Sequence, residues 1–244
     1  MKQKLKVCWV SAGVSSFIAG YLVRDTVDEF IYIDIADQHP DSMRFIADCE
    51  KALGKPINIL RSTEYKCVGD VCRANRFIVL PSGAKCTQAL KKRVRKKWEW
   101  EHQDYAITYV WGMDLNESGR AERIIEGMPQ FDHEFPLIDR SLSKADAHGI
   151  CAQLGIKRPV MYDMGYANNN CVGCVKGGAG YWNKIRVDFP AVFEDRAKME
   201  REIGHSILHN TEGMIFLDEL DPTAGRMNEE IMEDCSIFCQ LAIN

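Results

Sequence analysis

Long apolar runs are missing from this sequence of 244 residues. No stretch reaches the roughly 20 consecutive apolar residues that a membrane-spanning helix needs, and residues 1–6 lack the apolar core of a signal peptide. We therefore expect a cytoplasmic protein with no membrane partner. The net charge of −4 also gives the chain as a whole no attraction to nucleic acid or to an anionic membrane surface.

Internal repeats, low-complexity tracts and an obvious interdomain linker are missing too. A chain of this length can bury a sizeable core as one domain with a small appended region. We expect residues 1–170 to form a nucleotide-binding α/β domain and residues 171–244 to form a cysteine-bearing helical region packed on it. The sequence leaves the oligomeric state, monomer or homodimer, open.

Cysteine, in contrast, is abundant, with 10 residues. In a cytosolic protein this number argues against a disulfide framework and for metal or redox use of some cysteines. Cys8, Cys49 and Cys151 fall on the apolar faces of expected strands or helices. We therefore expect these three to be buried thiols with no role as ligands.

Segments typical of strands and helices alternate along the chain. The expected strands cover residues 5–10, 30–35, 57–60 and 105–111, with a short extended piece at 135–139. Expected helices begin near Asp41 and Ser143, and both residues are of types suited to a helix N-terminus. This alternation predicts an α/β fold with a mostly parallel sheet and helices on both faces.

A turn of small residues joins the first expected strand to the first helix. It consists of Ser11, Ala12, Gly13, Val14, Ser15 and Ser16. Small side chains let backbone N–H groups approach an anion, and the helix N-terminus adds a partial positive charge. The turn is therefore a candidate phosphate or sulfate site, although Ser15 or Ser16 could equally serve only to cap the helix.

Polar residues follow two further expected strands. Asp34 and Asp37 come at the end of the second strand, and Gly112, Glu117 and Arg120 follow the fourth. Ligands of open α/β sheets bind beyond the carboxyl ends of the strands. We therefore expect these residues to meet the small-residue turn at one edge of the sheet.

The most basic stretch is Lys91–Lys97, with six cations in seven residues, and Trp98 and Trp100 follow it. On a helix this pattern is typical of a solvated face. It also suits contact with polyphosphate or an RNA backbone, with tryptophan available for stacking on bases.

Cys171 and Cys174 form the strongest local motif, a C-x-x-C pair that can bring two thiolates to one centre. Cys235 and Cys239 form a second pair, and Cys86 stands alone before the basic stretch. Three interpretations stay open on spacing alone. They are an iron–sulfur cluster with Cys86, a structural zinc held by both pairs, and a redox dithiol.

These motifs occur in the order found in one family. The chain resembles the phosphoadenylyl-sulfate (PAPS) reductase family, within the PP-loop ATP pyrophosphatase, or adenine nucleotide α-hydrolase, superfamily. The family's S-G-G-x-D-S loop is similar to residues 11–16, its D-T-G-x-x-x-P-E-T motif to 34–42 and its G-x-R-x-x-E-S-x-x-R element to 112–120. Its late L-Y-D-x-G-Y-x-x-x-G-C-x-x-C stretch is similar to residues 161–174.

The resemblance implies a Rossmann-like (HUP) fold that binds an adenine nucleotide, ATP with magnesium. The implied nucleotide-binding residues are the turn Ser11–Ser16, Asp34 and Gly112, and the implied catalytic residues are Asp34, Asp37, Glu117 and Arg120. We also expect Tyr162 and Tyr166 to pack near the cysteine stretch and position it.

The iron–sulfur branch of the family implies a 4Fe–4S cluster on Cys86, Cys171 and Cys174. Thr87 stands where that branch has a second upstream cysteine. We therefore predict Cys239 as the fourth ligand, with Cys235 or an open iron position as alternatives. Zinc is the alternative metal.

Three departures from the family bear on the reaction. Ser15 stands where ATP-cleaving members have Asp, Met113 replaces the Arg of the G-x-R element, and the reductases' C-terminal E-C-G-x-H motif is matched only loosely at Cys235. We predict an enzyme that activates an acceptor with ATP and couples this to sulfur chemistry at the cluster. The alternatives are a sulfonucleotide reductase that uses a C-terminal cysteine, and a nucleotide- or RNA-binding module with structural zinc.

Overall fold

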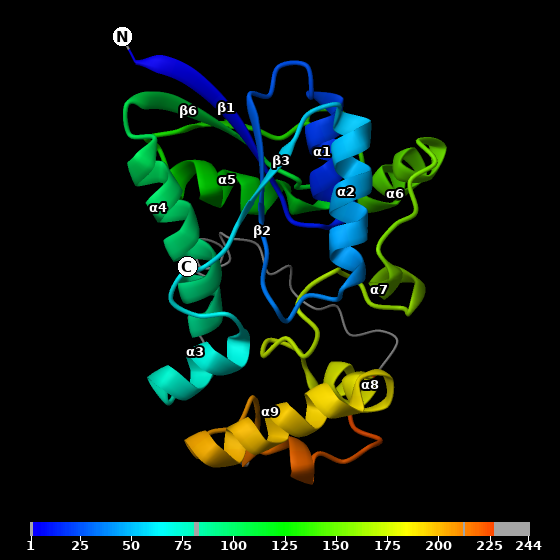
Figure 1. Cartoon of the computed structure of the whole chain (residues 1–244). Coiled ribbons are helices and arrows are strands. Elements are labelled where there is room, and N and C mark those ends of the chain that lie inside the picture. The colour runs from blue at the N-terminus through cyan, green and yellow to red at the C-terminus, as the bar shows by residue number, and fades with distance from the viewer. Residues whose placement is uncertain (1, 81–82, 212, 227–244) are drawn as a thin grey trace.

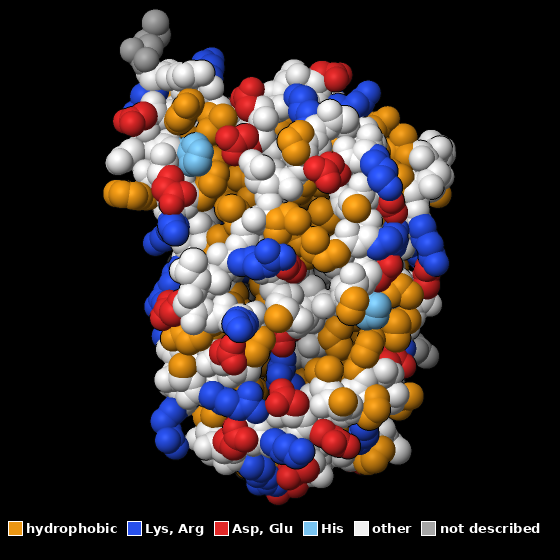
Figure 2. Space-filling model, viewed as in Figure 1, with side chains coloured by type: hydrophobic (Ala, Val, Ile, Leu, Met, Phe, Trp, Pro, Cys, Tyr) orange, Lys and Arg blue, Asp and Glu red, His pale blue; other side chains and the backbone are white. Residues whose placement is uncertain are grey.

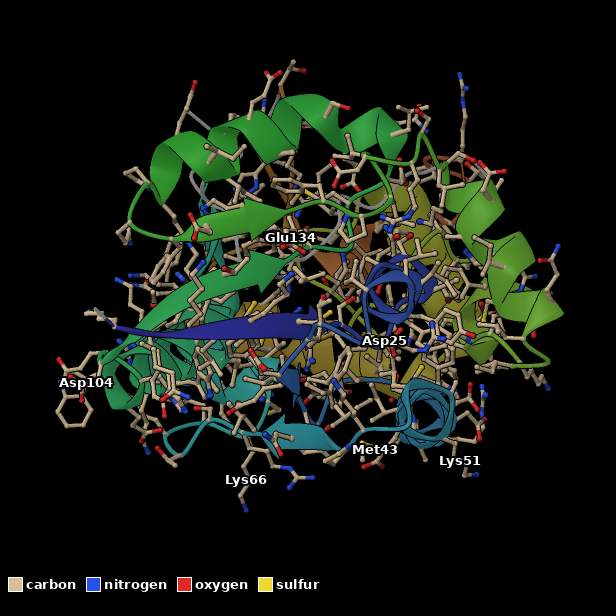
Figure 3. All side chains as sticks on the ribbon, turned by 90° about the horizontal axis from the view of Figure 1, so that it is seen from above. Asp25, Met43, Lys51, Lys66, Asp104 and Glu134 are labelled. Carbon is tan, nitrogen blue, oxygen red and sulfur yellow. The ribbon has the colours of Figure 1, made fainter. Side chains whose placement is uncertain are left out.

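Five parallel strands form the central sheet of the computed structural model, which describes residues 2–80, 83–211 and 213–226. Their order across the sheet is β3-β2-β1-β6-β7, as Figure 3 shows from above. The strands are β1 (Gln3–Val10), β2 (Glu29–Ile33), β3 (Ile57–Leu60), β6 (Tyr105–Val110) and β7 (Asp132–Glu134). The predicted α/β fold with a parallel sheet is confirmed.

Helices cover both faces of this sheet (Figure 1). They are α1 (Val14–Leu22), α2 (Asp41–Leu53), α3 (Val68–Asn75), the π-helical η1 (Thr87–Lys92) continuing into α4 (Arg93–Glu101), the 3-10 turn η2 (Leu115–Glu117), α5 (Ser118–Gly127), α6 (Lys144–Gln153), α7 (Val160–Asp163), α8 (Ala179–Asp188), α9 (Pro190–Ile203) and the 3-10 turn η3 (Leu217–Glu219). Two small antiparallel pairs complete the described elements: β4 (Val79–Leu80) with β5 (Gly83–Ala84), and β8 (Leu208–Asn210) with β9 (Gly213–Ile215).

The side chains of β1 alternate between two apolar cores because successive residues of a strand point to opposite faces. Val7 and Trp9 belong to the core that contains residues of α4 and α5, whereas Cys8 and Val10 belong to the core that contains residues of α1, α2 and α6. The sheet is thus buried on both faces, as parallel sheets generally are.

The three cysteines predicted to be plain buried thiols lie in the core beside α1. Cys8, Cys49 and Cys151 are at most 1% exposed. Burial raises the pKa of each thiol, to about 12 for Cys8. Their predicted burial is confirmed.

The fifth strand differs in place from the predicted extended piece at residues 135–139. The strand is Asp132–Glu134, which pairs with β6 through its backbone, and a run of turns follows it. An apolar pattern could not indicate a strand of polar residues. The apolar Phe135 and Leu137 are buried from the following turns instead.

Residues beyond 170 contribute to the same buried core as the sheet. Trp182 and Ile185 of α8 and Leu217 of η3 are fully buried in the core that also contains Val7 and Trp9. Helices α8 and α9 form the lower part of the molecule in Figure 1. On the face seen in Figure 2, basic and acidic side chains are interspersed over this part. Within the described residues, no helix combines the length and the apolar character needed to cross a membrane.

The basic stretch carries exposed cations such as Lys96 and Lys97, as a solvated helix face does, but two of its arginines are paired. Arg93 pairs with Glu64, and the buried Arg95 pairs with Glu99. Trp98 is only 5% exposed and packs between Trp9 and His102. The prediction that Trp98 is available to stack on a base was wrong, because this tryptophan belongs to the apolar side of α4. Trp100, predicted with it, is 69% exposed.

Glu200 fixes the chain that follows α9 by accepting hydrogen bonds from it. Its fully buried carboxylate accepts hydrogen bonds from the backbone N–H groups of Ile207, at 2.5 Å, and Leu217, at 2.6 Å. Burial outweighs these two hydrogen bonds and raises the pKa of Glu200 to about 7. The folded protein therefore holds a proton on this group at pH values where the unfolded chain has lost it.

We predict that the free energy of unfolding falls as pH rises from about 4.5 to about 7, by up to about 3 kcal/mol, and that Glu200→Gln removes this component. The variant should also be less stable at low pH by about 1–3 kcal/mol, because one backbone N–H loses its acceptor. Urea unfolding between pH 5 and 8 measures both effects. Glu194→Gln, at an exposed position on the same helix, is the matched control; an unchanged pH slope in Glu200→Gln contradicts the assignment.

Candidate functional site

The order of the strands creates a crevice between the carboxyl ends of β1 and β6. From β1 the chain goes first outward to β2 and β3, and then returns to β6 and β7 on the other side. The connections on the two sides of this boundary run in opposite directions, so they leave a gap where they diverge. Such a boundary is called a topological switch point, and open α/β sheets bind ligands there. Ser11 follows β1 at this boundary, and Gly112 follows shortly after β6.

The small-residue turn is held by the hydroxyl of Ser16. This hydroxyl accepts a hydrogen bond from the backbone N–H of Ser11 and donates to the carbonyl of Gly13, both at 2.9 Å, and it lies 2.9 Å from the Ser11 hydroxyl. Ala12 has a positive φ of 58° that reverses the chain. The prediction that Ser15 or Ser16 caps the helix was wrong, since Gly13 is the N-cap residue and no side chain caps α1.

The first N–H groups of a helix have no partner within it. In α1 these belong to the residues that follow Gly13, and Ser15 and Ser16 among them line the pocket described below. Together with the positive end of the helix dipole, they can bind an anion. The turn thus has the small residues and the helix start that the sequence analysis required of a phosphate site; phosphate binding itself stays a prediction.

Gly112 is packed directly against this turn. A Cβ atom added to Gly112 would lie 2.3 Å from the Cα atom of Ser16 and 2.7 Å from its backbone nitrogen. Backbone atoms cannot be moved away by a change of rotamer. Any larger residue at this position must therefore displace the turn or the chain after β6.

A pocket of about 240 Å³ opens over the turn. It is lined by Ser11, Gly13, Ser15, Ser16, Gly112, Asp114, Asn116, Glu117, Lys144, Tyr162, Asn168, Asn169 and Asn170. The structure thus brings together six residues that the sequence singled out: Ser11, Gly13, Ser15, Ser16, Gly112 and Glu117. Ala12 and Val14 also belong to the turn, but both are fully buried in the core beside α1.

Asp34 and Asp37 do not line the pocket. Asp34 forms an ion pair with Arg61 at 2.7 Å. The half-buried Asp37, whose side chain is 8% exposed, pairs with Arg196 and accepts a hydrogen bond from Val68 N–H at 2.6 Å. Both follow β2, one strand away from the switch point. Their positions give no support to the predicted catalytic contact of these two residues with a ligand, or to the predicted nucleotide contact of Asp34.

Glu117 is part of the pocket wall, and Arg120 stands behind it. One carboxylate oxygen of Glu117 accepts a hydrogen bond from the backbone N–H of Asp114 at 3.2 Å, and the other accepts from Arg120 at 2.6 Å. With the Asp114 side chain, which accepts from the N–H of Asn116, this forms a reciprocal cap on η2. The pocket therefore carries two carboxylates, Asp114 and Glu117, that are already oriented.

Lys144 is a pocket residue that the sequence analysis did not assign to the nucleotide site. It is the first residue of α6, and its Nζ atom donates to the carbonyl of Ala167 at 2.7 Å and to the side chain of Asn168 at 2.6 Å. An ammonium group has three donors, so these bonds leave capacity for an anion in the pocket. Only its place just after the predicted cap Ser143 could have drawn attention to it.

The segment that carries Tyr162 and residues 168–170 is fixed to α2. The N–H of Val160 donates to the carboxylate of Asp41 at 2.8 Å, and Arg44 donates to the carbonyl of Lys157 at 2.6 Å. The Arg44 guanidinium holds the pKa of Asp41 below its usual range. This ion pair thus places one wall of the pocket, to which Tyr162 contributes.

Three cysteines meet beside a second, much smaller cavity. Cys86, Cys171 and Cys174 are each at most 7% exposed and line a space of about 10 Å³, together with Lys91 and apolar side chains. The loop of Cys171 is bridged to Gln38, just after β2. The three cysteines that the family resemblance groups as ligands thus line one small cavity; their role as ligands stays a prediction.

The hydroxyl of Tyr181 shapes this cysteine loop. It accepts a hydrogen bond from the N–H of Cys174 at 2.9 Å and contacts the carbonyl of Cys171 at 3.3 Å, to which it can donate. Burial raises the pKa of Tyr181, so the phenol keeps the proton that it donates. Tyr166, predicted to position this region, packs edge-to-face on the Tyr181 ring.

Three of the four predicted metal ligands, Cys86, Cys171 and Cys174, lie within the described residues. A cavity of about 10 Å³ has room for about one water molecule. Among residues 2–80, 83–211 and 213–226, no group of three or more His, Cys, Asp or Glu is arranged to hold a metal ion. The predicted fourth ligand Cys239 and its alternative Cys235 lie outside the described residues.

No protein-family model matches this chain, and no curated protein matches it. The similarity to PAPS reductases therefore stays a prediction from motifs. What the structure adds to it is the placement of the small-residue turn, Gly112 and Glu117 around one pocket.

We predict that Gly112→Ala distorts the pocket and lowers stability by about 1–3 kcal/mol, because the new Cβ overlaps the backbone of Ser16. Thermal unfolding measures the loss. Gly149→Ala, on the exposed side of α6 with open space around its Cβ position, is the control and should not be destabilised. Equal stability of Gly112→Ala and the parent protein would contradict the close contact.

Proposed function

We propose that the protein is an enzyme that binds an adenine nucleotide, ATP, in the pocket between β1 and β6 and uses it to activate an acceptor. The observation that carries this proposal is the convergence of the small-residue turn, Gly112 and Lys144 on one pocket at the switch point of the sheet. In this proposal the phosphates rest on the N–H groups at the start of α1, and Lys144 neutralises part of their charge.

The pocket carboxylates fit the magnesium that accompanies ATP. Asp114 and Glu117 supply the hard oxygen ligands that Mg²⁺ prefers. They replace Asp34 and Asp37, which the sequence suggested for the catalytic role. Catalysis at such a site consists of positioning the nucleotide and stabilising charge on its phosphates.

The cysteine trio has the chemistry of an iron–sulfur or zinc site. Thiolates are the ligands of both, and Cys86, Cys171 and Cys174 lie in a dry region beside Lys91. The small cavity holds no more than about a single ion as it stands, so a 4Fe–4S cluster requires the thiols to move apart. An iron–sulfur cluster would supply redox or sulfur chemistry next to the nucleotide site.

A nucleotide-binding module with reduced catalysis is the second candidate. The ion pairs of Asp34 and Asp37 favour it, because they take both predicted catalytic aspartates away from the ligand. An RNA-binding role keeps partial support: Arg93 and Arg95 in the basic stretch are paired and Trp98 is buried, whereas Trp100 is exposed. We also propose a cytoplasmic location, which suits the free thiols of Cys67 and Cys72.

We predict that calorimetry detects ATP binding, that the protein releases pyrophosphate from ATP, and that Lys144→Ala weakens binding about 10-fold, a loss of about 1.4 kcal/mol. Lys96→Ala, an exposed lysine of the basic stretch, is the control and should bind like the parent protein. Binding without turnover in the presence of any acceptor favours the module. Reduction of adenylyl sulfate with thioredoxin and no ATP cleavage favours the reductase, and failure of every adenine nucleotide to bind overturns the proposal.

We predict that protein purified without oxygen contains iron with broad visible absorption, and that Cys86→Ser and Cys174→Ser each lose most of the metal. Zinc without visible absorption favours the alternative metal. Cys67→Ser is the control, since Cys67 is the N-cap residue of α3 and serine can serve as well there. Metal-free parent protein, or unchanged metal content in both test variants, contradicts a cysteine centre.

A further inference from the structure

Two neighbouring asparagines in the pocket have buried polar atoms without hydrogen-bond partners. Asn169 is 5% exposed and Asn170 is 7% exposed, and both line the pocket. Within the described residues, the Oδ1 atom of Asn169 and the Nδ2 atom of Asn170 have no partner. Leaving such an atom buried and unpaired is unfavourable because its hydration is lost with nothing in return, so the pair points to a partner that occupies the pocket.

The orientation of the Asn169 amide is fixed by its other contacts. Its Nδ2 atom donates to the carbonyl of Ala12 at 2.8 Å and to the hydroxyl of Ser42 at 3.0 Å. The carbonyl of Ala12 can only accept, so the nitrogen must face it. The unpaired atom of Asn169 is therefore the acceptor oxygen, whereas the unpaired Asn170 atom is a donor.

This combination excludes a ligand that offers acceptors alone. Fully ionised phosphate oxygens could satisfy the donor of Asn170 but not the acceptor of Asn169. A hydroxyl group satisfies either one, because it both donates and accepts. The edge of a purine base also carries donors and acceptors.

The position of Asn169 separates the two possibilities. Its amide is bonded to Ala12, which belongs to the small-residue turn that the proposed function assigns to the phosphates. In a nucleotide the ribose is linked directly to the phosphates, and the base lies beyond it. The group that reaches an amide beside the phosphate site is therefore the sugar.

We propose that Asn169 and Asn170 bind the ribose hydroxyls of the nucleotide, and so make the site select ribonucleotides over deoxyribonucleotides. This inference rests on the proposed function, because it assumes that a nucleotide occupies the pocket. It adds a specificity that the phosphate-binding turn cannot supply, since phosphates are the same in both classes of nucleotide.

Calorimetric titration with ATP, 2′-deoxy-ATP, 3′-deoxy-ATP and purine riboside triphosphate tests the inference. The parent protein should bind ATP about 5- to 30-fold more tightly than at least one deoxynucleotide, which corresponds to one or two hydrogen bonds. In Asn170→Ala this preference should shrink at least threefold. Asn170→Asp keeps the shape but replaces the donor with an acceptor, so it should lose the preference too.

Asn58→Ala, an exposed asparagine of β3, is the matched control and should keep the full preference. The wild-type comparison of ATP with its deoxy forms stands even if a variant fails to fold, which circular dichroism reveals. Equal binding of ATP and both deoxynucleotides, or an unchanged preference in Asn170→Ala and Asn170→Asp, overturns the inference while leaving nucleotide binding intact. It is also overturned if the variants lose discrimination against purine riboside triphosphate instead, because the asparagines then contact the base.

If no nucleotide binds at all, the proposed function fails and the inference fails with it. That outcome is distinct from binding without sugar selectivity, so the two failures cannot be confused.

Discussion

The contact between the backbone of Gly112 and that of Ser16 is the constraint on which the candidate site depends. This contact brings the end of β6 against the start of α1. It exists because β1 and β6 are neighbouring parallel strands, so that their carboxyl ends lie side by side. The pocket is the space that this arrangement leaves in front of the turn. A glycine is required because a Cβ atom would occupy the position of the neighbouring backbone.

A second connection joins the later part of the chain to the carboxyl end of β2. Asp37 pairs with Arg196 of α9, and its carbonyl accepts a hydrogen bond from Val172 N–H in the cysteine loop at 2.8 Å. Breaking a buried ion pair by removing one partner is strongly destabilising. The physical role of Asp37 is therefore to fix the cysteine region on the sheet, which explains why a polar residue is found there without lining the pocket.

The sequence indicated the parallel sheet and the small-residue turn because both depend on local patterns: apolar strands of β length, and small residues before a helix. It could not indicate that Asp34 and Asp37 lie outside the pocket, because that depends on strand order, and β2 is one strand from the switch point. It also missed Lys144 and Asn169. Their roles arise from contacts with Ala167 and Ala12, and the Asn169–Ala12 contact joins residues 157 positions apart.

One short segment takes part in both candidate centres. Residues 168–170 line the pocket, and Cys171 and Cys174, immediately after them, line the cysteine cavity. Asn169 donates a hydrogen bond to the carbonyl of Ala12 in the small-residue turn, and Cys171 is bridged to the residues after β2. Both ends of this segment are therefore held on the sheet side, and the short spacing between the asparagines and the C-x-x-C pair keeps the pocket and the cysteine cavity close together.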